Sequence, residues 1–131
     1  MTNPHFSVED YAGVTVAKFS DTAILETAMI QQMGRDLYAL AEHGSKPKLV
    51  LDFSNVKILS SHMLGVLLTL QGKAQANKGA LSLCGLRPEL MKVFVITSLD
   101  KVFKFHADDV EGLAAFGVPI SRQTRAAREE I

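Results

Sequence analysis

Cysteine is nearly absent from this sequence, and tryptophan is absent altogether. The single cysteine, Cys84, lies in the apolar run ALSLCGL and has no second cysteine with which to form an internal disulfide. Small secreted domains generally depend on several disulfides, so that class of protein is disfavoured. A lone cysteine in an apolar run usually packs as a small buried hydrophobe, and we expect this of Cys84.

An excess of either charge is also missing. The chain has 131 residues with 14 basic and 14 acidic side chains, and its formal net charge is +0. Proteins that bind nucleic acid or an anionic membrane usually carry a basic excess, and the composition gives no sign of one. We therefore expect neither kind of partner.

Long apolar runs are missing as well. The longest nearly apolar stretch, Met63–Leu70, is far shorter than the roughly 20 residues that a membrane-spanning helix needs. The first residues, MTNPHFSVEDYAG, contain no apolar core of a signal peptide. We expect a cytoplasmic protein with a single domain over residues 1–118 and a charged tail over residues 119–131.

The motifs of common catalytic sites are absent. The sequence has no GxxxxGK[ST] loop, no GxGxxG loop and no GxSxG turn. The histidines show no metal-binding spacing: His5, His43, His62 and His106. We predict no metal, no cofactor and no enzymatic activity, and a catalytic site assembled only by folding stays an open alternative. Asp52 is the last residue but one of the run KLVLDF and is expected to bond backbone groups at the end of a strand.

The spacing of apolar residues predicts the first half of the fold. Two strand-like runs over residues 6–21 flank Ala12–Gly13 and predict a hairpin. Apolar residues then recur at intervals of three and four, which predicts a helix capped by Asp21 or Thr22 and ended by Gly44. The nearly continuous apolar run KLVLDF is typical of a central, parallel strand that is covered on both faces.

The second half alternates in the same way. We predict a second helix over Ser60–Lys78, a strand over 80–86, a third helix over 87–99, a strand over 101–108 and a last helix over 109–117. Strands that alternate with helices after an opening hairpin indicate an α/β sandwich, with parallel strands and an antiparallel edge. Leu51, Leu67 and Phe94 are expected to be nearly fully buried.

Two adjacent serines, Ser60 and Ser61, stand between a predicted strand and the second helix. A hydroxyl at this position is a preferred helix N-cap. The same place offers free N–H groups and the positive end of the helix dipole, so a phosphate could be added there without unfolding the domain. The residues alone leave both interpretations open.

A family resemblance covers roughly Phe6 to Phe116. The segment KLVLDFSNVKILSSHMLGVLLTL, followed by GALSLCGLRPELMKVFVITSLDKVFKFH, resembles the STAS domain of bacterial anti-sigma factor antagonists. The resemblance implies a mixed sheet of four to five strands flanked by about four helices. It also implies a switch that binds other proteins and has no enzymatic activity.

The resemblance further implies the partners. In this family the unphosphorylated antagonist binds an anti-sigma factor, which is often a serine/threonine kinase of the antagonist, and a serine phosphatase reverses the modification. The family motif reads Asp-Ser-Ser-Gly, and the matching residues here are Ser60, Ser61, His62 and Met63. Ser60 therefore stands in the place of the Asp, Ser61 keeps the first Ser, and His62 replaces the second.

From this correspondence, the candidate phosphorylation sites are Ser61 and Ser60. The candidate partner-binding residues follow from the same turn: Ser60, Ser61, His62, Met63 and Leu64. We expect the binding surface to continue along the exposed face of the second helix, including Gln71 and Lys78. Met63 would suit a protein contact if exposed and would belong to the core if buried.

Two functional hypotheses result. The first is a partner-switching regulator, in which Ser60 mainly caps the helix and Ser61 is phosphorylated. The second is a STAS module that senses a ligand or signal without phosphorylation. In either case we expect a monomer or a weak dimer.

Overall fold

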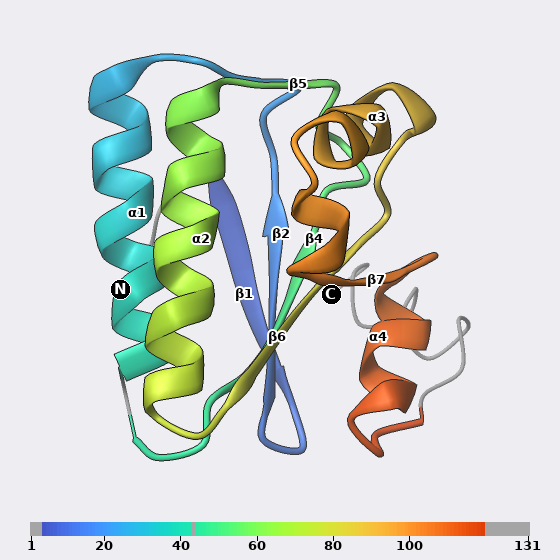
Figure 1. The fold of residues 1–131 in the computed structure, drawn as a ribbon. Helices are drawn as coiled ribbons and strands as arrows, with labels where there is room; N and C mark the ends of the chain where they lie inside the picture. The colour runs from blue at the N-terminus through green and yellow to red at the C-terminus, as the bar shows by residue number, and fades with distance from the viewer. Residues whose placement is uncertain (1–3, 43, 120–131) are drawn as a thin grey trace.

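The structure is a computed structural model that describes residues 4–42 and 44–119. Figure 1 shows the elements in chain order: β1 (Phe6–Tyr11), β2 (Val14–Phe19), β3 (Ala23–Ile24), α1 (Thr27–Glu42), β4 (Lys48–Asp52), β5 (Ile58–Leu59), α2 (Ser61–Ala76), β6 (Ala80–Cys84), α3 (Pro88–Ile96), the 3₁₀ turn η1 (Leu99–Lys101), β7 (Lys104–His106) and α4 (Asp109–Ala115).

The main sheet has five strands in the order β1-β2-β4-β6-β7. β1 and β2 form an antiparallel hairpin across Ala12–Gly13, and the remaining neighbours are parallel. The run KLVLDF supplies β4, which lies between β2 and β6. The predicted mixed sheet, the opening hairpin and the central strand are thus confirmed.

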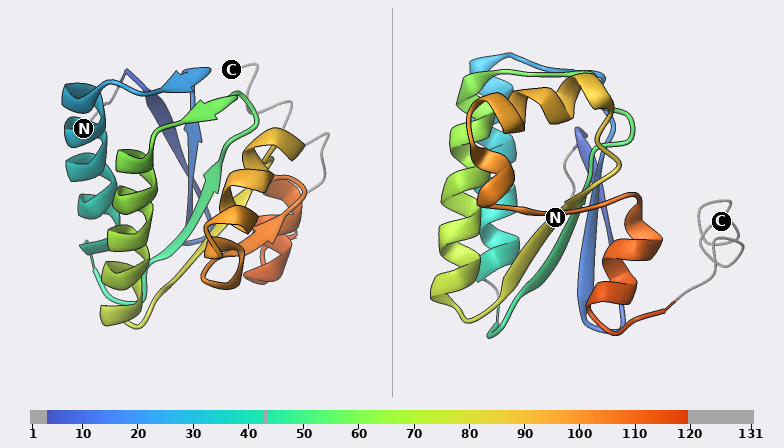
Figure 2. Two further views of the ribbon diagram at one scale, coloured as in Figure 1. Left: turned by 45° about the horizontal axis from the view of Figure 1, so that its top comes forward. Right: turned by 45° about the vertical axis from the view of Figure 1, so that its right-hand side comes forward.

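The two faces of the sheet are covered unequally. α1, α2 and α3 pack on one face, and among the described residues α4 is the one helix against the other face (Figures 1 and 2). Leu51, Leu67 and Phe94 belong to the core under the three helices, and each is 0% exposed. The predicted burial of these three residues is confirmed.

The other face holds a smaller apolar cluster. Its buried members are Tyr11, Val14, Val16, Val50, Cys84 and Leu113. Cys84 is therefore a buried core residue, as its apolar run predicted. Asp52 is buried at the end of β4, where its Oδ1 accepts a hydrogen bond of 2.9 Å from the Ser54 N–H, which confirms the predicted backbone contact.

The predicted start of the first helix is wrong. α1 begins at Thr27, and neither Asp21 nor Thr22 caps it. The reason is tertiary: Ala23–Ile24 is held extended as β3, which pairs in parallel with β5. The Lys57 N–H also donates to the Thr22 carbonyl at 2.7 Å.

The later elements are shorter than predicted, and the differences are largest in α2, α3 and the last strand. α2 ends at Ala76, and Lys78 lies beyond it with a left-handed backbone at φ 61°. α3 ends at Ile96, and Ser98, which is left-handed at φ 62°, is the N-cap of η1. The last strand is only Lys104–His106.

Parts of the sequence predictions fall outside the described residues. These parts are His43 and all of the charged tail except Pro119. The domain boundary at residue 118 therefore stays a prediction. Within residues 4–42 and 44–119, none of the helices combines the length and the hydropathy needed to cross a membrane.

Candidate functional site

Ser60 is fixed at the N-terminus of α2 by three hydrogen bonds. Its extended backbone (φ −83°, ψ 162°) is that of an N-cap, and its Oγ accepts from the Met63 N–H at 3.3 Å. Its carbonyl accepts from the Leu64 N–H at 3.3 Å, and its own N–H donates to the Ile24 carbonyl at 3.0 Å. The predicted capping role of Ser60 is confirmed.

Ser61 is the first residue of α2 and is exposed, as is His62 beside it. The first turn of α2 contains no acidic side chain. N–H groups at a helix start lack intrahelical acceptors and lie at the positive end of the helix dipole, which favours an anion. A phosphoryl group on Ser61 would therefore meet local stabilisation and no nearby carboxylate of α2.

Met63 and Leu64 have buried side chains. Met63 is fully buried and Leu64 is nearly so, and both pack in the main apolar cluster. Their side chains therefore belong to the core, and a contact of Met63 or Leu64 with a partner stays a prediction. Met63 shares one face of α2 with Leu67, Leu70 and Ala74, a spacing that turns it toward the sheet.

Several exposed apolar side chains lie on α2 and on the segments beside it, and together they form an apolar rim. We use this name for the exposed side chains Leu25, Ile58, Leu68, Val95 and Ile96, of which Ile96 is 81% exposed. Ile58 belongs to the β3–β5 ladder and Leu25 directly follows β3. The ladder is bonded to Ser60 through the Ile24 carbonyl. Val95 and Ile96 end α3, whose C-terminal end lies beside α2 in both Figures 1 and 2.

The exposed face of α2 carries no charge. Lys73 is the only Lys, Arg, Asp or Glu in this helix. It lies toward α1, where its Nζ is 3.4 Å from the Glu42 carboxylate and 5.2 Å from the centre of the Tyr38 ring. Surface helices usually carry charged side chains on the face turned to water, so an uncharged face is suited to contact with another protein.

Two residues expected on this surface lie elsewhere. The Gln71 side chain is half-buried, and its Nε2 donates to the Val102 carbonyl at 3.1 Å, which joins α2 to η1. Lys78 lies in the turn after α2, at the end of the helix opposite Ser61. The candidate surface is therefore the start of α2 with the apolar rim, and the far end of the helix is not part of it.

The remaining sequence candidates do not converge. His5 Nδ1 contacts Asp21 Oδ2 at 2.5 Å, His62 is exposed on α2, and His106 lies in β7. Among the described residues, no group of three or more His, Cys, Asp or Glu side chains is arranged to hold a metal ion.

Ser60→Ala should lower the free energy of unfolding by about 0.5–2 kcal/mol, because it removes the acceptor for the Met63 N–H. Ser61→Ala makes the same chemical change one residue later, at an exposed position, and should stay within about 0.5 kcal/mol of wild type. Urea unfolding followed by circular dichroism measures both. Equal losses in the two variants would contradict the assignment of the cap to Ser60.

Comparisons with known proteins cover most of the chain. A family model described as "Mlab, STAS domain" matches residues 23–105. An anti-sigma-factor antagonist (STAS) domain protein from Planctomyces limnophilus is 22% identical with a TM-score of 0.79, over 86% of this chain and 97% of that one. An anti-sigma factor antagonist from Mycobacterium paratuberculosis is 25% identical with a TM-score of 0.71, over 88% of this chain and 97% of that one.

A third solved structure is the anti-sigma factor antagonist SpoIIAA in its unphosphorylated form. It is 16% identical with a TM-score of 0.72, over 88% of this chain and 99% of that one. SpoIIAA, described as a Bacillus cell fate determinant, is also known in a phosphorylated form. At this identity the similarity concerns the fold alone.

Proposed function

The chain belongs to the STAS domain family, and on that basis we propose that it is a non-enzymatic regulator that binds an anti-sigma factor or a related serine kinase. The observation that carries the proposal is the start of α2, where an uncharged helix face meets the apolar rim. Exposed apolar side chains gathered on one surface usually mark a protein contact. Partners of this class act in the cytoplasm, and we propose that compartment for the chain.

Phosphorylation of Ser61 is the proposed control. Ser61 is exposed at the first position of α2, while the neighbouring Ser60 hydroxyl is engaged in capping the helix. A phosphoryl group adds about −1.5 to −2 charges at neutral pH. Placed among the apolar rim, this charge would be desolvated by a docking partner, so the modified form should bind weakly. A serine phosphatase would restore binding.

The structural neighbour SpoIIAA supports the proposal that phosphorylation is the control. SpoIIAA is an anti-sigma factor antagonist known in both unphosphorylated and phosphorylated forms. The chain itself supplies the acceptor position: the Ser61 side chain is exposed and is therefore accessible without opening the core. Modification at this position would change the surface and leave the fold intact.

Ser61→Asp should fold normally and bind the partner about tenfold more weakly or worse, because a carboxylate replaces a hydroxyl inside the contact. The partner is first captured from host lysate with the wild-type chain, and its affinity for purified variants is then measured by calorimetry. Lys104→Asp, which introduces a carboxylate at an exposed position in β7, is the matched control and should bind as wild type.

The same experiment tests phosphorylation. If the captured protein is a kinase, incubation with ATP should add one phosphate to the wild-type chain and none to Ser61→Ala, as read by intact mass. A partner that binds wild type and Ser61→Asp equally would contradict the proposed surface. If Ser61→Ala also gains a phosphate, the modified residue is not Ser61.

A further inference from the structure

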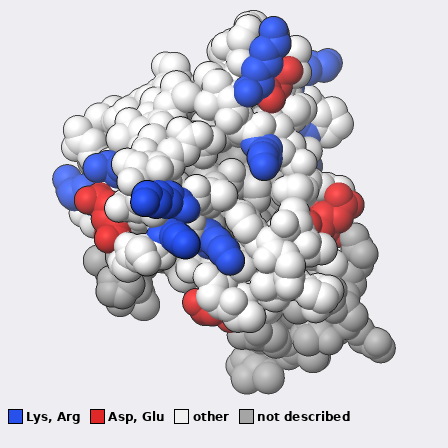
Figure 3. All heavy atoms as spheres, turned by 60° about the horizontal axis from the view of Figure 1, so that its bottom comes forward, with Lys and Arg blue, Asp and Glu red and all other residues white. Residues whose placement is uncertain are grey.

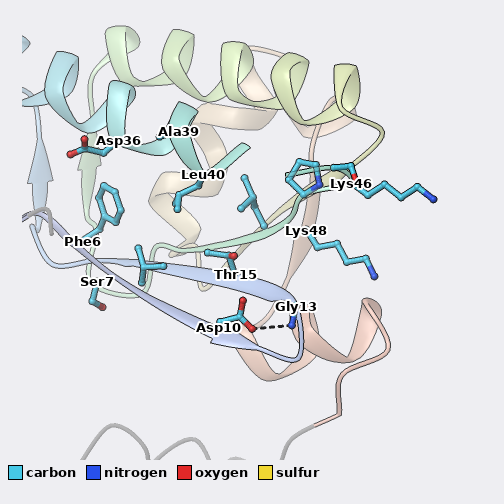
Figure 4. A pocket seen from close by; sticks show the side chains of 14 residues that line it. Phe6, Ser7, Asp10, Gly13, Thr15, Asp36, Ala39, Leu40, Lys46 and Lys48 are labelled. Carbon is cyan, nitrogen blue, oxygen red and sulfur yellow. Dashed lines mark hydrogen bonds between the residues drawn. The ribbon is translucent and has the colours of Figure 1, made fainter. Parts of the chain in front are cut away.

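A groove opens on the side of α1 that faces the β1–β2 hairpin, away from the start of α2. Its volume is about 860 Å³, within the range of about 300–1,000 Å³ that is usual for small-molecule sites. Figure 4 shows side chains from β1, β2, α1 and the start of β4 around it. Phe6, Val8, Leu40 and Leu49 are among its apolar lining residues.

The groove exists because β1 is the edge strand of the sheet. Phe6 and Val8 are two residues apart and therefore point to the same face. Phe6 is buried under α1, whereas Val8 is still 45% exposed, and Leu40 of α1 is half-buried. The apolar lining is thus open to solvent along the outer part of β1.

One end of the groove is basic. Lys46 and Lys48 are exposed and line it, and Figure 4 shows both at the same end. The exposed Lys78 belongs to the adjoining turn, because the Lys46 N–H donates to the Asn77 carbonyl at 2.9 Å. Figure 3 brings this end of the molecule forward and shows Lys and Arg side chains gathered on it.

Acidic groups lie at both ends of the groove, and they give the two ends a different charge. Asp10 lies near the lysines, with its Oδ1 accepting from the Gly13 N–H at 2.9 Å. Among the residues that line this end of the groove, two lysines, Lys46 and Lys48, stand against this one carboxylate. Asp36 is buried at the other end, where its Oδ1 accepts from Gln32 Nε2 at 3.1 Å.

We propose that this groove binds a small amphipathic anion, with its apolar body against Phe6, Val8 and Leu40 and its acidic head at Lys46 and Lys48. Apolar lining favours a hydrocarbon or aromatic body, since burying it removes apolar surface from water. The lysines favour a carboxylate or phosphate head, and the Asp36 carboxylate disfavours the reverse orientation. The site is separate from the partner surface at the start of α2.

The test uses decanoate and decyl phosphate as probes, below their micelle-forming concentrations, with calorimetry for affinity and amide NMR shifts for location. Both probes should shift the amides of Val8, Gly13, Leu40 and Lys48 and leave that of Ser61 unchanged. Decyltrimethylammonium has the same chain with a cationic head and should bind about tenfold more weakly. Acetate, the head without the chain, should not bind measurably.

Variants assign the roles of the lining residues. Lys46→Gln and Lys48→Gln should each weaken decanoate binding by about twofold to fivefold, because each removes one exposed charge contact. Lys104→Gln, at an exposed position in β7, should leave binding unchanged. Val8→Ser should weaken both anionic probes together, and its thermal melt shows that the fold is retained.

Several results would overturn the proposal. Equal affinity for the anionic and cationic probes would show that the groove is an apolar surface that does not select for charge. Shifts centred on the apolar rim would place the amphiphile at the partner surface. A chain that is dimeric by light scattering, and becomes monomeric in Val8→Ser, would show that a second copy covers the groove.

Discussion

Gly79→Ala should lower the free energy of unfolding by about 2–4 kcal/mol. A β-carbon at this position would lie 2.0 Å from the Pro47 carbonyl oxygen and 2.6 Å from two carbons of the Pro47 ring. The same carbonyl accepts from the Ala80 N–H at 2.8 Å, so it cannot withdraw without loss of that bond. Chemical unfolding of the variant measures the effect.

Gly72→Ala is the matched control. Gly72 lies on the exposed face of α2, where an added β-carbon meets no atom within 4 Å. Alanine in a helix interior is favoured over glycine by roughly 0.5–1 kcal/mol, so this variant should be more stable than wild type. If Gly79→Ala lowers the free energy of unfolding and Gly72→Ala raises it, the contact with Pro47 explains the loss in Gly79→Ala. If Gly79→Ala were as stable as wild type, the segments that contain Pro47 and Gly79 could separate freely.

Leu67→Ala should cost about 2–5 kcal/mol, since it removes a fully buried side chain between α2 and the sheet and leaves a cavity. Leu68→Ala removes the same atoms from the next residue, which is 40% exposed. The second variant should lose no more than about 1 kcal/mol, because its side chain is already partly in water. Urea denaturation of both variants gives the comparison, with the free energy of unfolding falling at the same slope with urea concentration in both.

Similar losses in the Leu67 and Leu68 variants would mean that the orientation of α2 about its axis is wrong. That outcome would also affect the candidate site. Ser61 and Leu68 are seven residues apart, so they lie on nearly the same side of the helix. The exposure of Ser61 and the burial of Leu67 are therefore two consequences of one orientation.

The regular elements could be predicted because their apolar residues follow a clear period. Leu51 lies in an almost continuous apolar run, and Leu67 recurs with Leu64 and Ala74 at helical spacing. The β3–β5 ladder could not be found in this way. Each of its strands has two residues, too few to show any period, and the pairing joins segments more than thirty residues apart.

The candidate site was predicted in part. A hydroxyl immediately before an apolar helical run is enough to suggest an N-cap, and Ser60 is one. The burial of Met63 could also have been found, because it is in phase with Leu67 and Leu70. The apolar rim could not, since its members come from four separate segments of the chain. The place of the last turn of α3 depends on where the helix ends, and no sequence pattern predicts the left-handed backbone of Ser98 that follows it.

The thin cover on one face of the sheet determines how the molecule opens. α4 has seven residues and contributes one buried apolar side chain, Leu113, to the smaller cluster. Elements with few buried contacts detach at a lower free energy than the whole domain unfolds. Release of α4 would therefore expose Val50 and Cys84 to water while the layer of three helices stays in place. Cys84 is the only thiol in the chain, so its reaction with a thiol reagent would report this partial opening.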